Sequence, residues 1–291
     1  MIEKNKERIF MVGSRWLYYK IYSGIKISDE LLIVVIDKLT HKFSEKKMID
    51  KWFFIRYADP EQHIRLRFHL TDLDYISDII REMNSELELF VNKKMISSVQ
   101  IGMYNRELER YGNYTIEESE SLFHLNSVFI INLTKLIKDK NNLWLFGMKF
   151  IDRFLDLWNL SLEDKKALLE NLKNSFGQEH GINKALKKQL SLKFRHNRKN
   201  IEHVIENYTN AQVESFLETH QELAAPIIHE ILKKKSNNLL EIPLDDLLSS
   251  YLHMHCNRLF RSRQRTNEWV LYDLLYNYYY SKHARLKKHN K

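Results

Sequence analysis

The chain has 291 residues, of which 44% are apolar, and it contains one cysteine, Cys256. A single cysteine excludes an intramolecular disulfide and fits a reducing cytosol, and no apolar run is long enough to cross a bilayer. The net charge of +8 comes from 46 basic and 38 acidic residues that are mixed along the chain, so charge alone selects no partner. A folded cytoplasmic protein is therefore expected, and the N-terminal residues do not have the pattern of a signal peptide.

The first third of the chain predicts alternating strands and helices. Aromatic and β-branched residues predict a strand over 16–23, and the leucine and isoleucine spacing over 28–43 predicts a helix with Ser28 as its N-cap. The segments WFFIRYAD and HIRLRFHL flank the turn at 59–62 and predict a β-hairpin.

A second helix beginning at Thr71 or Asp72 and a strand over 96–107 complete the order β-α-β-β-α-β. This order is typical of a ferredoxin-like α+β fold, in which the helices cover one face of a four-stranded antiparallel sheet. From about residue 115 the pattern is helical, with Ser161 as an expected N-cap and with Pro226 and Pro243 in expected first turns. We therefore expect a ferredoxin-like subdomain over 1–112 and a helical subdomain over 113–291, packed together as one compact unit.

The strand HIRLRF places three polar residues on one face. Strict alternation should direct Ile64, Leu66 and Phe68 toward the helices. The opposite face, in the middle of the sheet, should carry His63, Arg65 and Arg67. A row of cations is costly unless an anion or solvent neutralises it. These residues are candidates for binding an anion, although a solvated strand face is the simpler alternative.

A second polar cluster lies in YNRELERYG, residues 104–112. Glu107 and Arg110 are three residues apart, so one helical turn would bring them together as an ion pair. Tyr104 lies in the same dense group of polar and aromatic residues.

A third cluster lies in HMHCNRLFRSR, residues 253–263, where a helix would put His253 and Asn257 on the same face. His255 would point elsewhere, which argues against a His-x-His metal pair and against a Cys256–His255 catalytic pair. The sequence contains no P-loop, no GxGxxG, no GxSxG and no cysteine-rich metal set, so we expect neither a cofactor nor a metal.

Taken together, WFFIRYADPEQHIRLRF, YNRELERYG and HMHCNRLF resemble the C-terminal elimination domain of the lantibiotic dehydratases, which also occurs as a free-standing protein in thiopeptide clusters. The resemblance covers nearly the whole chain, with the motifs in the same order and spacing. It implies that a partner subunit, fed by glutamyl-tRNA, attaches glutamate to Ser or Thr of a precursor peptide. The elimination domain then removes glutamate, leaving dehydroalanine or dehydrobutyrine.

The family's working residues match this chain at five positions, Arg65, Arg67, Glu107, Arg110 and His253. The resemblance implies catalytic roles for Arg67, His253, Arg110 and Glu107, and we expect Arg65, His63, Tyr104 and Asn257 to contact the substrate. Arginines suit this chemistry because the reaction develops enolate charge and releases a carboxylate. His253 would act as general base or as proton donor to the leaving group, and both roles stay open.

Two other functions stay open at this point. Thiopeptide pyridine synthases resemble elimination domains but join two dehydroalanines in a formal 4+2 cycloaddition and expel water and the leader peptide. A non-catalytic module that binds RNA or the precursor peptide is the third possibility, although the strand aromatics lack an RNP1-type pattern. The expected partners are the precursor peptide and a glutamylating subunit, with no direct need for nucleic acid or a membrane. Homodimerisation stays open.

Overall fold

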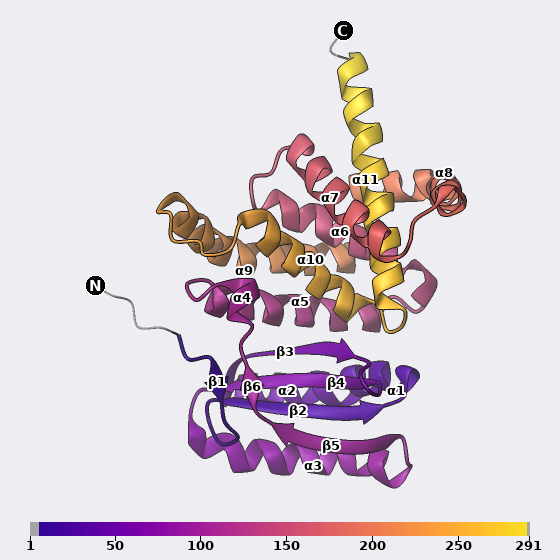
Figure 1. The fold of residues 1–291 in the computed structure, drawn as a ribbon. Coiled ribbons are helices and arrows are strands. Elements are labelled where there is room, and N and C mark those ends of the chain that lie inside the picture. The colour runs from indigo at the N-terminus through magenta and orange to yellow at the C-terminus, as the bar shows by residue number, and fades with distance from the viewer. Residues whose placement is uncertain (1–5, 290–291) are drawn as a thin grey trace. The chain divides into compact units, whose positions relative to one another are not determined.

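Two apolar runs joined by a polar turn form the hairpin that organises the main sheet. A computed structural model describes residues 6–289, and Figure 1 shows the four strands of this sheet side by side. β3 (Ile49–Tyr57) pairs antiparallel with β4 (His63–Leu70), and β2 (Trp16–Ser23) pairs with the other edge of β4. β5 (Ile96–Gly102) pairs with the free edge of β2, which gives the order β3-β4-β2-β5. β4 therefore lies inside the sheet, as the sequence predicts.

Outside the main sheet, the chain up to Leu136 forms helices and a second, two-stranded sheet. The second sheet pairs β1 (Ile9–Phe10) with β6 (Tyr104–Asn105) and was not predicted, because strands of two residues leave no alternation to detect. The helical segments are α1 (Ile25–Glu30), the π-helical η1 (Leu31–Ile36), α2 (Asp37–Glu45), the 3-10 turn η2 (Leu73–Tyr75), α3 (Ile76–Asn92), α4 (Leu108–Tyr111) and α5 (Ile116–Leu136). The architecture is mixed α/β with two small antiparallel sheets.

One face of β4 builds the core between the sheet and its helices. Ile64, Leu66 and Phe68 are fully buried. The ring of Phe68 meets the ring of Phe43 from α2 edge to face, with their centroids 5.8 Å apart. Each fully buried side chain of this size contributes about 1.5–3 kcal/mol through burial. The predicted apolar face of β4 is confirmed, and the polar residues of the strand face the other way.

Helix α5 protects the edge strand β3. The Ser127 hydroxyl accepts a hydrogen bond from the backbone N–H of Phe54 (3.3 Å), and His124 Nδ1 lies 3.0 Å from the carbonyl oxygen of Trp52. The rings of Phe53 and Phe123 pack at 5.4 Å. Side chains of α5 therefore occupy backbone groups that an open sheet edge would otherwise expose.

Contacts divide the chain into two compact units. The first comprises the described residues up to Lys135 together with His229–Leu247, and the second comprises Leu136–Ile228 and the described residues from Leu248 onward. Residues 113–135, which the sequence analysis assigned to the helical subdomain, thus lie in the unit that contains the sheets. Lys234 joins residues 229–247 to this unit, because its Nζ lies 2.6 Å from Glu118 Oε1.

The second unit consists of helices. Its elements are η3 (Lys140–Asn142), α6 (Leu143–Asp156), α7 (Leu162–Glu179), α8 (Lys184–Glu206), the first part of α9 (Ala211–Ser236), most of α10 (Leu244–Leu259) and α11 (Gln264–His289). Ser161 caps α7 in a capping box with Asp164, as predicted. Among residues 6–289, none of the helices combines the length and apolar character that crossing a bilayer requires.

Two helix boundaries differ from the predictions. The first helix begins at Ile25 after Gly24, and the Ser28 hydroxyl donates to the carbonyl oxygen of Ile25 (2.8 Å), so Ser28 is not the N-cap. Pro226 lies inside α9 rather than in a first turn. Both predictions relied on local signals, which do not fix helix boundaries by themselves.

Two buried histidines make the stability of the helical unit depend on pH. The rings of His255 and His220 both contact Phe150, with centroid distances of 4.3 and 4.7 Å. Burial lowers the pKa of His220 to about 4 and, with the charge of Arg258 adding to it, lowers the pKa of His255 to about 3. In the unfolded chain both histidines bind a proton near pH 6.5.

We expect the free energy of unfolding of this unit to fall as the pH drops from about 6.5 toward 4, because the unfolded state then binds more protons. Each histidine contributes a slope of up to about 1.4 kcal/mol per pH unit. Urea unfolding monitored between pH 7 and pH 5 measures this slope. His255→Phe keeps a ring beside Phe150 but removes one titrating group, so it should lower the slope by the contribution of one histidine. An unchanged slope in this variant would contradict the role of His255 in the pH dependence.

Candidate functional site

The register of the main sheet places aromatic and basic side chains on the face opposite α2. Directly opposed residues of antiparallel strands share a face, and Arg67 pairs with Tyr18 and Phe53. The next two rows of this face pair Lys20 with Arg65 and Ile55, and Tyr22 with His63 and Tyr57. We call the following set the cationic face: Tyr18, Lys20, Tyr22, Phe53, Tyr57, His63, Arg65 and Arg67.

Arg67 is a buried cation enclosed by rings. Its exposed fraction is 8%, and its guanidinium carbon lies 4.5 Å from the ring centroid of Tyr18, 4.7 Å from that of Tyr104 and 5.1 Å from that of Phe53. Its Nε is buried without a hydrogen-bond partner, and no carboxylate within residues 6–289 forms an ion pair with it. Cation–π contacts offset part of the cost of burying the charge. An uncompensated N–H still favours an incoming anion, for which the planar guanidinium is well suited.

Arg56 of β3 is a buried arginine of the same sheet that does have a carboxylate partner. It is also 8% exposed, but one terminal nitrogen lies 2.6 Å from Asp29 Oδ1 and the other donates to the Ser28 hydroxyl at 2.9 Å. The two arginines are equally buried, yet only Arg56 has a carboxylate partner in the described part of the chain. Burial alone therefore does not explain why Arg67 has no counter-ion among the described residues.

His63 holds Arg65 in position. His63 is 3% exposed; its Nδ1 lies 2.8 Å from the carbonyl oxygen of Glu61, and its Nε2 accepts a hydrogen bond from Arg65 Nε at 3.1 Å. Burial, reinforced by the nearby Arg65 charge, lowers the pKa of His63 and favours the neutral ring that this arrangement needs. The Arg65 guanidinium carbon lies 3.4 Å from the ring centroid of Tyr57. Direct contact between His63 and substrate stays a prediction, whereas the observed contacts give His63 a positioning role.

Tyr104 is fixed by a buried carboxylate. Its hydroxyl donates to Glu120 Oε1 at 2.9 Å, while Arg106 donates to both oxygens of Glu120 at 2.7 Å. Burial and the Glu120 charge raise the pKa of Tyr104. Because its hydroxyl is engaged in this way, Tyr104 presents its ring to Arg67. Glu120 was not among the predicted site residues, because nothing in its local sequence marks it.

Glu107 and Arg110 form the predicted ion pair at the start of the short helix α4. Arg110 Nε lies 3.4 Å from Glu107 Oε2, and the two side chains are 45% and 63% exposed. An exposed pair of this kind contributes little to stability, about 0–1 kcal/mol. Both side chains are accessible to a ligand, which is compatible with the expected catalytic roles.

His253 in α10 forms a hydrogen-bonded pair with a buried carboxylate. Its Nδ1 lies 3.0 Å from each oxygen of Glu268, which is fully buried in α11. The Tyr272 hydroxyl donates to Glu268 Oε1 at 2.8 Å, and the Gln264 amide donates to Oε2. With Nδ1–H directed at Glu268, the second ring nitrogen of His253 is available for proton transfer. The side chain of His253 is 24% exposed.

The neighbours of His253 differ from it in burial. Cys256 is fully buried, and burial raises the pKa of its thiol, which makes it a poor nucleophile. His255 is buried against Phe150, and Asn257 is half-buried one helical turn after His253. Among residues 6–289, no three His, Cys, Asp or Glu side chains are arranged to hold a metal ion.

The structure separates the predicted site residues into two groups. Arg65, Arg67, His63, Tyr104, Glu107 and Arg110 belong to the unit with the sheets, and His253 and Asn257 belong to the helical unit. Lys20, Tyr18 and Glu268 were not among the predicted site residues. The alternation in WLYYKIYS signals the first two, whereas no spacing rule connects Glu268 with His253.

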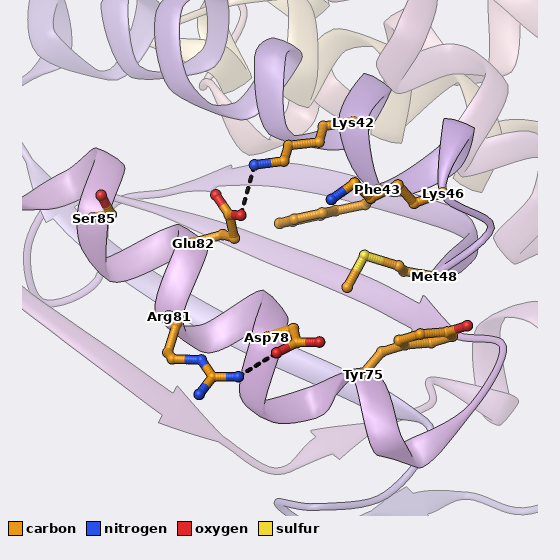
Figure 2. Close-up of a pocket in the computed structure, with 9 residues that line it drawn as sticks. All are labelled: Lys42, Phe43, Lys46, Met48, Tyr75, Asp78, Arg81, Glu82 and Ser85. Carbon is orange, nitrogen blue, oxygen red and sulfur yellow. Dashed lines mark hydrogen bonds and ion pairs between the residues drawn. The ribbon is translucent and has the colours of Figure 1, made fainter.

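A pocket of about 640 Å³ lies on the helical side of the first unit, between α2 and α3. Figure 2 shows its walls, in which Lys42 pairs with Glu82 and Arg81 pairs with Asp78. None of its lining residues is a predicted site residue. Lys42 and Arg81 are paired with carboxylates and the third cation of the lining, Lys46, is exposed, so the pocket has no buried cation comparable to Arg67.

Comparisons with known proteins agree with the motifs. The chain is 28% identical to the nisin biosynthesis protein NisB of Lactococcus lactis subsp. lactis over 265 residues, and 25% identical to the subtilin biosynthesis protein SpaB of Bacillus subtilis over 269 residues. These alignments cover 90% and 91% of this chain and 25% of each relative. The chain thus spans about a quarter of the length of these curated relatives.

Solved structures show a similar fold. The tRNA-dependent lantibiotic dehydratase MibB from Microbispora sp. 107891 matches with a TM-score of 0.72 and 21% identity, over 94% of this chain and 29% of MibB. The pyridine synthase TbtD from thiomuracin biosynthesis matches with a TM-score of 0.68 and 10% identity, over 92% of this chain and 98% of TbtD. The sequence profile described as "Lantibiotic biosynthesis dehydratase C-term" matches residues 16–279. The chain therefore belongs to the family of lantibiotic dehydratase C-terminal domains.

Proposed function

We propose that this domain removes glutamate from glutamylated serine or threonine residues of a precursor peptide, leaving dehydroalanine or dehydrobutyrine. The observation that carries the proposal is the buried Arg67 guanidinium, which has no carboxylate partner within the described residues. A buried cation without a counter-ion is costly unless an anion binds to it. The elimination supplies that anion, because glutamate leaves as a carboxylate.

The chemistry assigns one task to each group. The reaction breaks the Cα–H bond of the modified residue and forms the Cα=Cβ bond, while the Cβ–O bond breaks and its electron pair leaves with the glutamate carboxylate. His253, oriented by Glu268, transfers the proton, either from Cα or to the leaving group. Arg67 stabilises the negative charge that develops in the transition state. The exposed pair of Glu107 and Arg110 contacts the ammonium and carboxylate groups of the substrate.

The proposed partners follow from this reaction. A glutamylating subunit is needed to make the ester. The precursor peptide that bears this ester is then the substrate of this domain. Family membership supports a role in lantibiotic-type biosynthesis, in line with the nisin and subtilin biosynthesis proteins. The strand order β3-β4-β2-β5 also supports classing the main sheet and its helices as ferredoxin-like.

Pyridine synthesis is the second candidate, because the fold also matches that of TbtD. That reaction involves no glutamyl ester, so a synthase has no use for residues that bind glutamate. This chain has all five of the residues to which the resemblance assigns roles in elimination, Arg65, Arg67, Glu107, Arg110 and His253. Their retention supports elimination over cycloaddition.

The test is to incubate the purified protein with a glutamylated precursor peptide and to follow the intact mass. We expect the peptide to lose glutamic acid and to gain one dehydro residue for each ester. An unchanged glutamylated peptide, together with cyclisation of a peptide that already contains dehydroalanines, would establish the synthase instead. Binding without a mass change in either assay would identify a non-catalytic peptide-binding module.

A further inference from the structure

The cationic face contains a pair of positive charges in addition to Arg67. Lys20 of β2 lies directly opposite Arg65 of β4 in the register of the sheet. Like charges in directly opposed positions destabilise a sheet, because their Cβ atoms are only about 4.5–5.5 Å apart. Both side chains are half-buried, and neither forms an ion pair with any carboxylate in residues 6–289.

The rest of this row supplies no negative charge. Ile55 flanks Arg65 on β3, and Gln100 flanks Lys20 on β5. The row thus consists of an apolar residue, two cations and an amide. A row with this composition is unfavourable when empty and becomes favourable when a carboxylate binds between the cations.

The two cations are held differently. Arg65 is fixed, since His63 Nε2 accepts its Nε–H at 3.1 Å and its guanidinium carbon lies 3.4 Å from the Tyr57 ring centroid. Its terminal nitrogens form no hydrogen bond within the described residues. The Lys20 ammonium lies 5.9 Å from the centroid of the Tyr18 ring, on a flexible stem. The fixed Arg65 guanidinium and the more mobile Lys20 ammonium can together bind a carboxylate whose position is set by the rest of the substrate.

We propose that Lys20 and Arg65 form a carboxylate subsite that recognises the free side-chain carboxylate of the glutamyl group. This inference rests on the proposed function, in which Arg67 serves the other carboxylate, the one that forms as the ester bond breaks. The side-chain carboxylate is charged before, during and after elimination. The subsite therefore selects glutamyl esters over neutral ones, and Lys20 is a specificity-determining residue.

A binding experiment tests the subsite without requiring turnover. The probes are two precursor peptides in which an amide replaces the reactive ester, one carrying glutamate and the other carrying glutamine. The protein should bind the glutamyl probe about 10- to 100-fold more tightly than the glutaminyl probe, as expected for charge-assisted hydrogen bonds. Lys20→Met should remove most of this preference by weakening binding of the glutamyl probe alone, and Lys20→Arg should retain it.

Lys42→Met is the matched control, because Lys42 is also half-buried but already pairs with Glu82 from α3. It should leave the preference unchanged. Equal binding of the two probes by the unmodified protein, or an equal loss for both probes in Lys20→Met, would overturn the subsite. A Lys20-dependent preference in a protein that eliminates nothing from the glutamyl ester would overturn the proposed function and leave the subsite standing.

Discussion

Replacing Arg67 with methionine is expected to slow glutamate elimination on the order of 10²- to 10³-fold, the usual cost of removing one group that stabilises transition-state charge. Folding stability should change little. The change removes an N–H group that has no partner among residues 6–289, and a methionine sulfur still packs well against Tyr18, Tyr104 and Phe53. Intact-mass measurements over time give the elimination rate, and urea unfolding gives the free energy of unfolding, so the two effects are measured separately.

Arg56→Met provides the matched comparison, because Arg56 is as buried as Arg67 and lies on the neighbouring strand. It should destabilise the protein by about 3 kcal/mol, since Asp29 is left without its buried partner. The remaining folded enzyme should eliminate glutamate at the unmodified rate. If Arg67→Met instead destabilises the protein as much as Arg56→Met and retains its rate, Arg67 is a structural residue and the proposed function loses its main support.

The second large effect is expected at His253 and its carboxylate. His253→Ala should lower the elimination rate by about 10²- to 10⁴-fold, the range for loss of a positioned acid or base. Glu268→Gln keeps the size of the side chain but removes the acceptor charge that orients the Nδ1–H of His253. It should lower the rate at least about tenfold, because the ring is no longer held in one tautomer.

His255→Phe is the control for this pair, because His255 lies in the same helix but is buried against Phe150. It should change the pH dependence of unfolding and leave the elimination rate unaltered. The double variant Arg67→Met/His253→Ala should be scarcely slower than the poorer of the two single variants, as groups that serve one step are not additive. Normal elimination by His253→Ala would refute the proton-transfer role.

The cationic face was predictable because strand alternation is a local property. The period of two in HIRLRF assigns Ile64 and Arg67 to opposite faces without knowledge of the rest of the fold, and the structure confirms this. The i, i+3 spacing likewise predicts the contact between Glu107 and Arg110. The resemblance of the motifs was sufficient to identify the family, and the family profile that matches residues 16–279 confirms it.

Local signals failed where packing between elements decides the outcome. Ser28 has the side chain of an N-cap, yet its helix begins three residues earlier, and Pro226 lies inside a helix of 26 residues. At Ser28 the hydroxyl donates to the carbonyl oxygen of Ile25 instead of capping the helix. In α9 the burial of apolar residues on both sides of Pro226, among them Leu217 and Ile228, outweighs a proline cost of a few kcal/mol.

The sequence by itself determined which residues carry positive charge and which face of the strand they occupy. Only the tertiary structure decided which of those charges lack a partner. Arg56 and Arg67 are the same residue type on neighbouring strands, and alternation shows only that they lie on opposite faces of the sheet. In the structure α1 supplies Asp29 to Arg56, whereas Arg67 contacts aromatic rings and no carboxylate within residues 6–289. Glu268 lies 15 residues after His253 on another helix. Such pairings depend on how elements pack against each other, and that is set by the whole core and not by any short stretch of the chain.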